Sequence, residues 1–190
     1  MKNNIGIVLP LSFAAPISYY STLLKNDFYS FSINDAFKKQ SFRNRYFICN
    51  SIGKQLLTIP VKKHLKNTPF NEIEISYQEN WQQNHIRSLE SAYKKSPYFE
   101  YFWDDLLPIY QNKFVSLIEA CEVSNKLINS IVGLAKQEIV LDKVCTKDFE
   151  LSQDIFKEYY QVFSPKIPFV PNLSILDLIM NEGKNSINFL

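Results

Sequence analysis

Hydrophobic and polar residues follow two different spacings along this chain. The first third carries short apolar or alternating runs of the kind typical of β-strands. These runs lie at residues 5–9, 28–33, 45–49, 55–61 and 73–76. The segment Asn50 to Lys54 (NSIGK) indicates a hairpin turn between the third and fourth runs. Helical spacing interrupts the series at residues 17–25, and two further strand candidates follow later, at 138–141 and 186–190.

From residue 81 onward the spacing becomes that of α-helices. We predict helices over 81–95, from 97 to about 108, over 114–132 and over 174–181. Asn80 with Gln83 predicts a capping box, Pro97 is expected at the first position of its helix, and Gly183 closes the last helix. Pro108 is expected to end or kink the helix that contains it.

This order of strands and helices predicts one α/β domain over residues 1–190. We expect a mixed sheet with helices packed on it and a helical middle segment. An α+β meander with a helical insertion is the alternative. With 46% hydrophobic and 15% aromatic residues, the chain can form a packed core, unlike a disordered chain.

Composition and charge exclude several classes of function. A formal net charge of +2 is too close to neutral for a nucleic-acid binder. No apolar stretch reaches the roughly 18–20 residues of a membrane span, and Pro10, Ser12 and Pro16 break up an N-terminal run that superficially suggests a signal peptide. The three cysteines are far apart and form no metal-binding or disulfide pattern. We therefore expect a cytoplasmic protein without a metal or a cofactor.

Arginine is rare in this chain, and two of the arginines lie close together. There are 21 basic residues, of which only Arg43, Arg45 and Arg87 are arginines. If Arg43-Asn44-Arg45 is extended, both guanidinium groups point to one face, where they suit a phosphate, a sugar nucleotide or a carboxylate. The alternative is structural, with the arginines pairing with acidic residues such as Asp27 or Asp35.

Histidine and aspartate supply the other candidates for chemistry. His85 lies one helical turn after Trp81, on a face that we expect to be more polar than that of Ile86, and it could act as a general base. The alternative is a partly buried histidine that packs on Trp81. Asp177 is either a helix-capping carboxylate or part of a polar cluster with Asn172 and Asn181.

Several motifs together resemble the WbqC-like proteins of bacteria. In chain order they are LPxxFxxPIxYY from Leu9, QSFRNRYFI from Gln40, LLTIPV, the stretch from Trp81 to Phe102, YYQVF and FVPNLSILDLIMNEG. The resemblance covers nearly the whole chain in the same order.

This resemblance implies a role and a set of residues. Some WbqC-like proteins are encoded among O-antigen and surface-polysaccharide biosynthesis genes, and a glycine-transferase role has been suggested for that group. The family pattern falls here on Arg43, Asn44, Arg45, Trp81, His85, Tyr160, Asn172 and Asp177. The chain departs from the pattern where it has Leu9 in place of a glutamine and Cys121 in place of an asparagine.

Two hypotheses about function follow. The first is a transferase that acts on an activated sugar or a carrier-linked glycan, including by aminoacyl (glycine) transfer. In it Arg43 and Arg45 hold an anionic donor, a sugar nucleotide or an activated amino acid, Asn44 orients it, and His85 accepts a proton. Trp81 or Tyr160 would form an apolar wall. The second is a non-catalytic ligand-binding or scaffold protein of polysaccharide assembly. The sequence does not set the oligomeric state.

Overall fold

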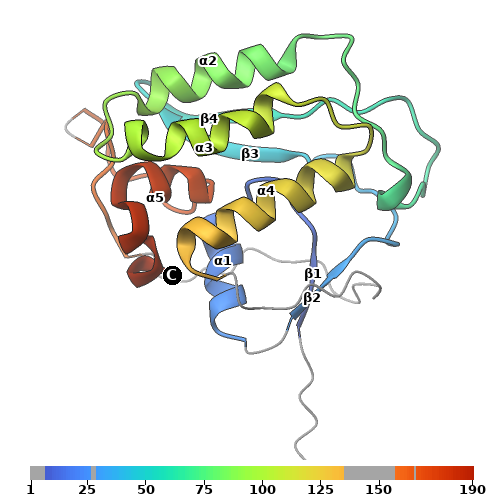
Figure 1. Cartoon of the computed structure of the whole chain (residues 1–190), viewed down its shortest axis with the longest axis horizontal. Helices are drawn as coiled ribbons and strands as arrows, with labels where there is room; N and C mark the ends of the chain where they lie inside the picture. Colours follow the sequence, from blue (N-terminus) through green and yellow to red (C-terminus); the bar gives the residue numbers. More distant parts are fainter. Residues whose placement is uncertain (1–6, 27–28, 135–156, 165) are drawn as a thin grey trace, which may run out of the picture.

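The computed structural model describes residues 7–26, 29–134, 157–164 and 166–190. Within these residues it contains five α-helices and two two-stranded β-sheets (Figure 1). The predicted α/β class is confirmed, with the strands divided between two small sheets. None of the described helices combines the length and the apolar character that crossing a bilayer requires.

The first sheet is a parallel pair. It is formed by β1 (Ile7–Pro10) and β2 (Tyr29–Ser32), which α1 (Ile17–Leu24) connects. Pro10 pairs with Ser32, so both strands end at the same level. A parallel pair needs such a crossover, because its strands must enter from the same side.

The loop from β1 to α1, residues 11–16, is buried throughout. A buried loop must find partners for its backbone groups. Here the Phe13 N–H donates to the Arg43 carbonyl (3.3 Å), and the Ala14 carbonyl accepts from the Ser174 hydroxyl (2.7 Å). The loop therefore ties the N-terminal part of the chain to both the centre of the sequence and its C-terminal part.

The second sheet is the predicted hairpin. Its strands are β3 (Arg45–Asn50) and β4 (Gly53–Thr58), paired antiparallel. One face of the hairpin contacts a helical layer, which Figure 1 shows in front of it. The helical elements are α2 (Trp81–Tyr93), α3 (Phe99–Gln111), α4 (Leu117–Val132), α5 (Ile175–Glu182) and the short 3-10 segments η1 (Phe70–Glu72) and η2 (Gly183–Phe189).

Some predicted elements differ from the structure. The strand predicted at 186–190 is wrong, because residues 186–189 belong to the 3-10 segment η2. Five residues with three apolar positions are too few to separate a strand from a helical turn. The run at 73–76 forms only isolated bridges, between Ile75 and Val61 and between Glu74 and Ser116. The strand candidate at 138–141 lies outside the described residues.

The helix ends predicted from capping residues and prolines are confirmed in part. The predicted capping box at Asn80 is wrong: its side chain caps nothing, since its ψ of 58° is not the extended conformation that a capping residue adopts. Ser174 does cap α5. The helix predicted to begin at Pro97 begins two residues later, at Phe99, and Pro108 lies inside it, three residues before its end.

Gly183 ends α5 in a conformation that requires glycine. Its φ is +58°, and a Cβ atom there would lie 2.6 Å from Cδ1 of the Tyr98 ring. We expect Gly183→Ala to lower the free energy of unfolding by about 2 kcal/mol, from backbone strain and overpacking. Urea denaturation measures the loss, with Gly53→Ala as the control, because Gly53 has a φ of +114° but nothing within 4 Å. Equal losses for the two variants would contradict a role for the Tyr98 contact.

Candidate functional site

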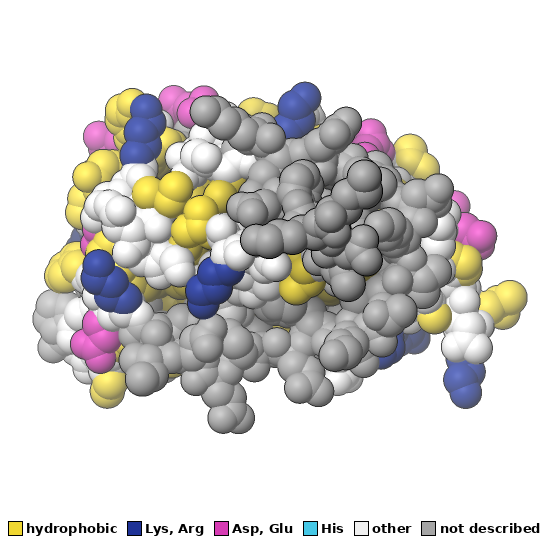
Figure 2. Space-filling view, turned by 90° about the horizontal axis from the view of Figure 1, so that it is seen from below, with side chains coloured by type: hydrophobic (Ala, Val, Ile, Leu, Met, Phe, Trp, Pro, Cys, Tyr) yellow, Lys and Arg dark blue, Asp and Glu magenta, His cyan; other side chains and the backbone are white. Residues whose placement is uncertain are grey.

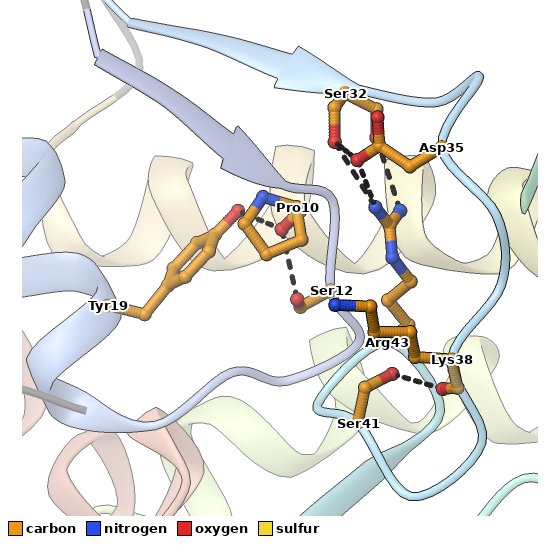
Figure 3. Close-up of polar contacts among 8 residues, drawn as sticks. All are labelled: Pro10, Ser12, Tyr19, Ser32, Asp35, Lys38, Ser41 and Arg43. Carbon is orange, nitrogen blue, oxygen red and sulfur yellow. Dashed lines mark hydrogen bonds and ion pairs between the residues drawn. The ribbon is translucent and has the colours of Figure 1, made fainter. Parts of the chain in front are cut away.

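The carboxyl ends of β1 and β2 form the first part of the candidate site (Figure 3). In open parallel sheets, ligands bind at this edge. The Pro10 carbonyl at the end of β1 accepts hydrogen bonds from the Ser12 hydroxyl (3.0 Å) and the Tyr19 hydroxyl (3.1 Å). At the end of β2, the backbone and side chain of Ser32 both face Arg43 (Figure 3).

Arg43 is buried at this edge and fully engaged. Its guanidinium donates to the Ser32 carbonyl (3.1 Å), the Ser32 hydroxyl (3.1 Å) and the Asp35 carboxylate (2.9 Å). The Ser32 hydroxyl in turn donates to the same carboxylate. The guanidinium carbon also lies 4.3 Å from the centre of the Phe70 ring. The structural alternative, pairing with Asp35, is thus confirmed for Arg43, while Asp27 lies outside the described residues.

The two arginines are not presented together as predicted. Arg43 and Asn44 lie in a turn before β3, so the tripeptide is not extended. Asn44 pins the end of β4: its side-chain amide donates to the Ile59 carbonyl (2.9 Å), and its own carbonyl accepts from the Ile59 N–H (2.8 Å). Arg45 begins β3 opposite Thr58.

Arg45 differs from Arg43 in its contacts. Its side chain is half-buried, and its Nε atom is buried without a hydrogen-bond partner. No acidic residue of the described chain forms an ion pair with it. Of the two arginines, Arg45 is therefore the one with hydrogen-bond donors still to be satisfied.

His85 lies in the core, on the other face of the hairpin. It is 3% exposed, whereas Ile86 is half-buried, so the expectation that His85 lies on the more polar face of α2 is wrong. Its Nε2 donates to the Thr58 carbonyl (3.1 Å), and its Nδ1 therefore accepts from the Tyr46 hydroxyl (2.9 Å). Burial lowers the pKa of His85 to about 4, which the hydrogen bond to Thr58 opposes. The imidazole is neutral near pH 7.

Trp81 and His85 do share a face, as predicted. Their ring centres are 5.1 Å apart, in an edge-to-face arrangement. Trp81 is buried as well, and its Nε1 has no hydrogen-bond partner. The pair is thus part of the core, as the alternative interpretation of a histidine packed on Trp81 proposed.

Asp177 is the third candidate group, and it is 1% exposed. Its carboxylate accepts from the Tyr159 hydroxyl (2.5 Å) and the Gln161 amide (3.1 Å). Burial raises the pKa of Asp177 to about 6, and the nearby hydroxyls of Tyr159 and Tyr93 and the Gln161 amide oppose that rise. The Gln161 side chain also donates to the Val170 carbonyl and accepts from the Val170 N–H. Together these hydrogen bonds hold the segment before α5 against that helix.

The predicted cluster of Asp177 with two asparagines does not form through their side chains. The Asn172 side chain instead accepts from the Ser18 N–H (2.9 Å) and so caps α1. The Asn181 amide donates to the backbone carbonyl of Asp177 (2.7 Å). Tyr160 is exposed, whereas its neighbour Tyr159 is buried.

The predicted site residues therefore lie in three places. Arg43 lies at the carboxyl edge of the first sheet, Arg45 lies on the hairpin with His85 of α2 against its other face, and Asp177 lies at the start of α5. Arg45 and Tyr46 are successive strand residues and point to opposite faces, so the Arg45 side chain is on the face away from His85. Sequence reasoning missed Ser32 and Tyr46, whose hydroxyls carry no local signal.

On the face that Figure 2 shows, the charged side chains of the described residues are dispersed. Lys and Arg side chains stand apart there, with acidic side chains around the rim. Among the residues that the structure describes, no group of three or more His, Cys, Asp or Glu side chains is placed to hold a metal ion.

A family model matches this chain over almost its whole length. The model is that of the WbqC-like protein family, and it matches residues 12–157 and 146–189. The chain belongs to this family. Neither the curated proteins nor the solved structures gave a match.

Proposed function

We propose that this WbqC-like protein binds an anionic, sugar-bearing small molecule, of the sugar-nucleotide class, in bacterial surface-polysaccharide biosynthesis. The biosynthetic setting follows from the family resemblance, and the ligand chemistry follows from Arg45. An arginine whose buried Nε–H has no acceptor destabilises the folded protein. Leaving a buried donor without an acceptor costs about 1–3 kcal/mol of stability, and more when the group is charged. A phosphate that accepts from this guanidinium removes that cost.

Arg45 is suited to this task in a way that lysine is not. Its planar guanidinium presents several N–H donors in a geometry that matches phosphate oxygens, whereas an ammonium is a point charge. Lysine fills most other positive positions of this chain. The arginine at position 45 is therefore the observation that carries the proposal.

The surroundings of His85 favour ligand binding over catalysis as the primary role of this protein. A general base must reach the proton that it abstracts. Both ring nitrogens of His85 are bonded, and the side chain is buried. The proposed role for His85 is therefore to hold α2 onto the end of β4.

Transfer chemistry is the second candidate function, and one observation favours it. Asp177 has a pKa of about 6, close to the value at which a group donates and accepts protons near neutral pH. In this alternative the chain transfers a sugar or an aminoacyl (glycine) group, and Asp177 is the group that donates and accepts the proton.

Isothermal titration calorimetry with UDP-glucose tests the proposed function. We expect Arg45→Gln to weaken binding about tenfold to a hundredfold, the loss of one or two charged hydrogen bonds. Arg45→Lys keeps the charge and is expected to lie between wild type and Arg45→Gln. Arg87→Gln is the matched control, since Arg87 is exposed on α2.

The same titrations separate the alternatives. Binding of a glycyl-adenylate analogue in place of UDP-glucose would favour aminoacyl transfer. Wild-type affinity for UDP-glucose in Arg45→Gln, or no binding of either probe to the wild type, would exclude the proposed role of Arg45.

A further inference from the structure

The hairpin face that carries Arg45 has a defined composition. In the antiparallel register, Arg45 pairs with Thr58, Phe47 with Leu56, and Cys49 with Lys54. Because side chains alternate, these six residues share one face, which we call the Arg45 face. The other face bears Tyr46 and Gln55, which contact α2 through His85 and Ser88.

The Arg45 face carries two cations and no carboxylate of its own. Lys54 is exposed, and its ammonium lies 4.2 Å from the centre of the Phe47 ring. No acidic residue of the described chain pairs with Lys54 or with Arg45. Burial and, to a smaller extent, the Asp177 carboxylate near its buried side chain raise the pKa of Cys49 to about 11, so this thiol is neutral near pH 7. The solvent-accessible part of the face, with Arg45 and Lys54, is therefore positive and complementary to an anion.

The two cations are held apart along the strand. Phe47 lies two positions after Arg45, which is ~7 Å along β3, and its ring holds the Lys54 ammonium in a cation–π contact. The ammonium therefore lies at the level of Phe47, two strand positions from the level of Arg45. One phosphate group is too small to bridge this separation, whereas two linked phosphates are long enough.

We propose that the Arg45 face binds the diphosphate of the ligand, with one phosphate on the Arg45 guanidinium and the other on the Lys54 ammonium. Thr58 lies directly across from Arg45, where its hydroxyl can donate to the first phosphate. This inference rests on the proposed function and narrows it, because it requires two linked phosphates and gives Lys54 a role that is independent of the sugar.

Titrations with inorganic pyrophosphate and inorganic phosphate on the full chain test this assignment. We expect the wild type to bind pyrophosphate at least tenfold more tightly than phosphate. Lys54→Gln is expected to lose about tenfold in pyrophosphate affinity and to bind the two probes equally. Lys66→Gln replaces an exposed lysine in a turn outside the hairpin, and this control is expected to match the wild type.

NMR of the arginine side chains locates the binding site directly. The chain has only three arginines, so at most three Nε–H signals need assignment, and the variants assign them. We expect the Arg45 signal to shift on addition of pyrophosphate, while the Arg87 signal stays in place. A shift confined to another arginine overturns the assignment.

The outcomes distinguish the two proposals. If Arg45→Gln weakens UDP-glucose binding and Lys54→Gln does not, ligand binding at Arg45 stands and the diphosphate assignment falls. Equal affinity of the wild type for phosphate and pyrophosphate also overturns the assignment. If neither variant changes the binding of any probe, both proposals fall.

Discussion

Replacing Arg43 by methionine is expected to lower the free energy of unfolding by about 3–5 kcal/mol, the usual cost of removing one partner of a buried ion pair. Methionine fills much of the same space but supplies no donor. The variant removes the guanidinium from which the Asp35 carboxylate accepts, and both the carbonyl and the hydroxyl of Ser32 lose a hydrogen bond. It also removes the cation that covers the Phe70 ring. Urea denaturation at pH 7 measures the loss.

A second ion pair of the chain supplies the control. The Lys62–Glu74 pair is exposed, with side-chain exposures of 62% and 48%, against 6% and 17% for Arg43 and Asp35. Exposed pairs contribute about 0–1 kcal/mol, so Lys62→Met is expected to unfold almost like the wild type. Similar losses for the two variants would show that Arg43 does not hold the loop after β2 onto the carboxyl edge.

This contrast between two arginines explains why the sequence predicted the site only in part. The unusual arginines were visible in a lysine-rich chain, and pairing of Arg43 with Asp35 was one of the two interpretations. Which arginine pairs depends on where β3 begins. It begins at Arg45, so Arg43 turns away toward Ser32, and no local pattern fixes that boundary.

The fold was more predictable than the site, because local periodicity determines most of it. The hairpin and all five α-helices were predicted, three of the helices to within two residues at both ends, since turn and cap residues mark many of these ends. The orientation of α2 was missed for a different reason. His85 can face the core only because Tyr46 and Thr58 satisfy its nitrogens, and they lie 39 and 27 residues away in the sequence.

The stability of the protein between pH 4 and pH 6.5 is expected to contain two opposing contributions, from His85 and Asp177. The folded pKa of His85 is about 4 against a usual 6.5, so its contribution to stability is complete above pH 6.5 and is lost as the pH falls toward 4. The folded pKa of Asp177 is about 6 against a usual 3.8, so its contribution is complete below pH 3.8 and is lost as the pH rises through 6. Each contribution is about 3 kcal/mol, because one pKa unit corresponds to about 1.4 kcal/mol.

Variants that replace His85 or Asp177 are expected to reveal how each group makes the free energy of unfolding depend on pH. In His85→Gln the opposing histidine contribution is absent, so between pH 6.5 and pH 4 the wild type loses about 3 kcal/mol of unfolding free energy relative to this variant. For Asp177→Asn the difference runs the other way, and the wild type loses about 3 kcal/mol relative to this variant as the pH rises from 4 to 7. Urea denaturation at four or five pH values measures both differences, in which every other titrating group cancels. Gln at position 85 and Asn at position 177 do not titrate in this range. A difference in unfolding free energy that stays constant with pH would therefore contradict the burial of the replaced group. It would mean that His85 or Asp177 does not occupy the buried position in which it bonds to Thr58 or Tyr159.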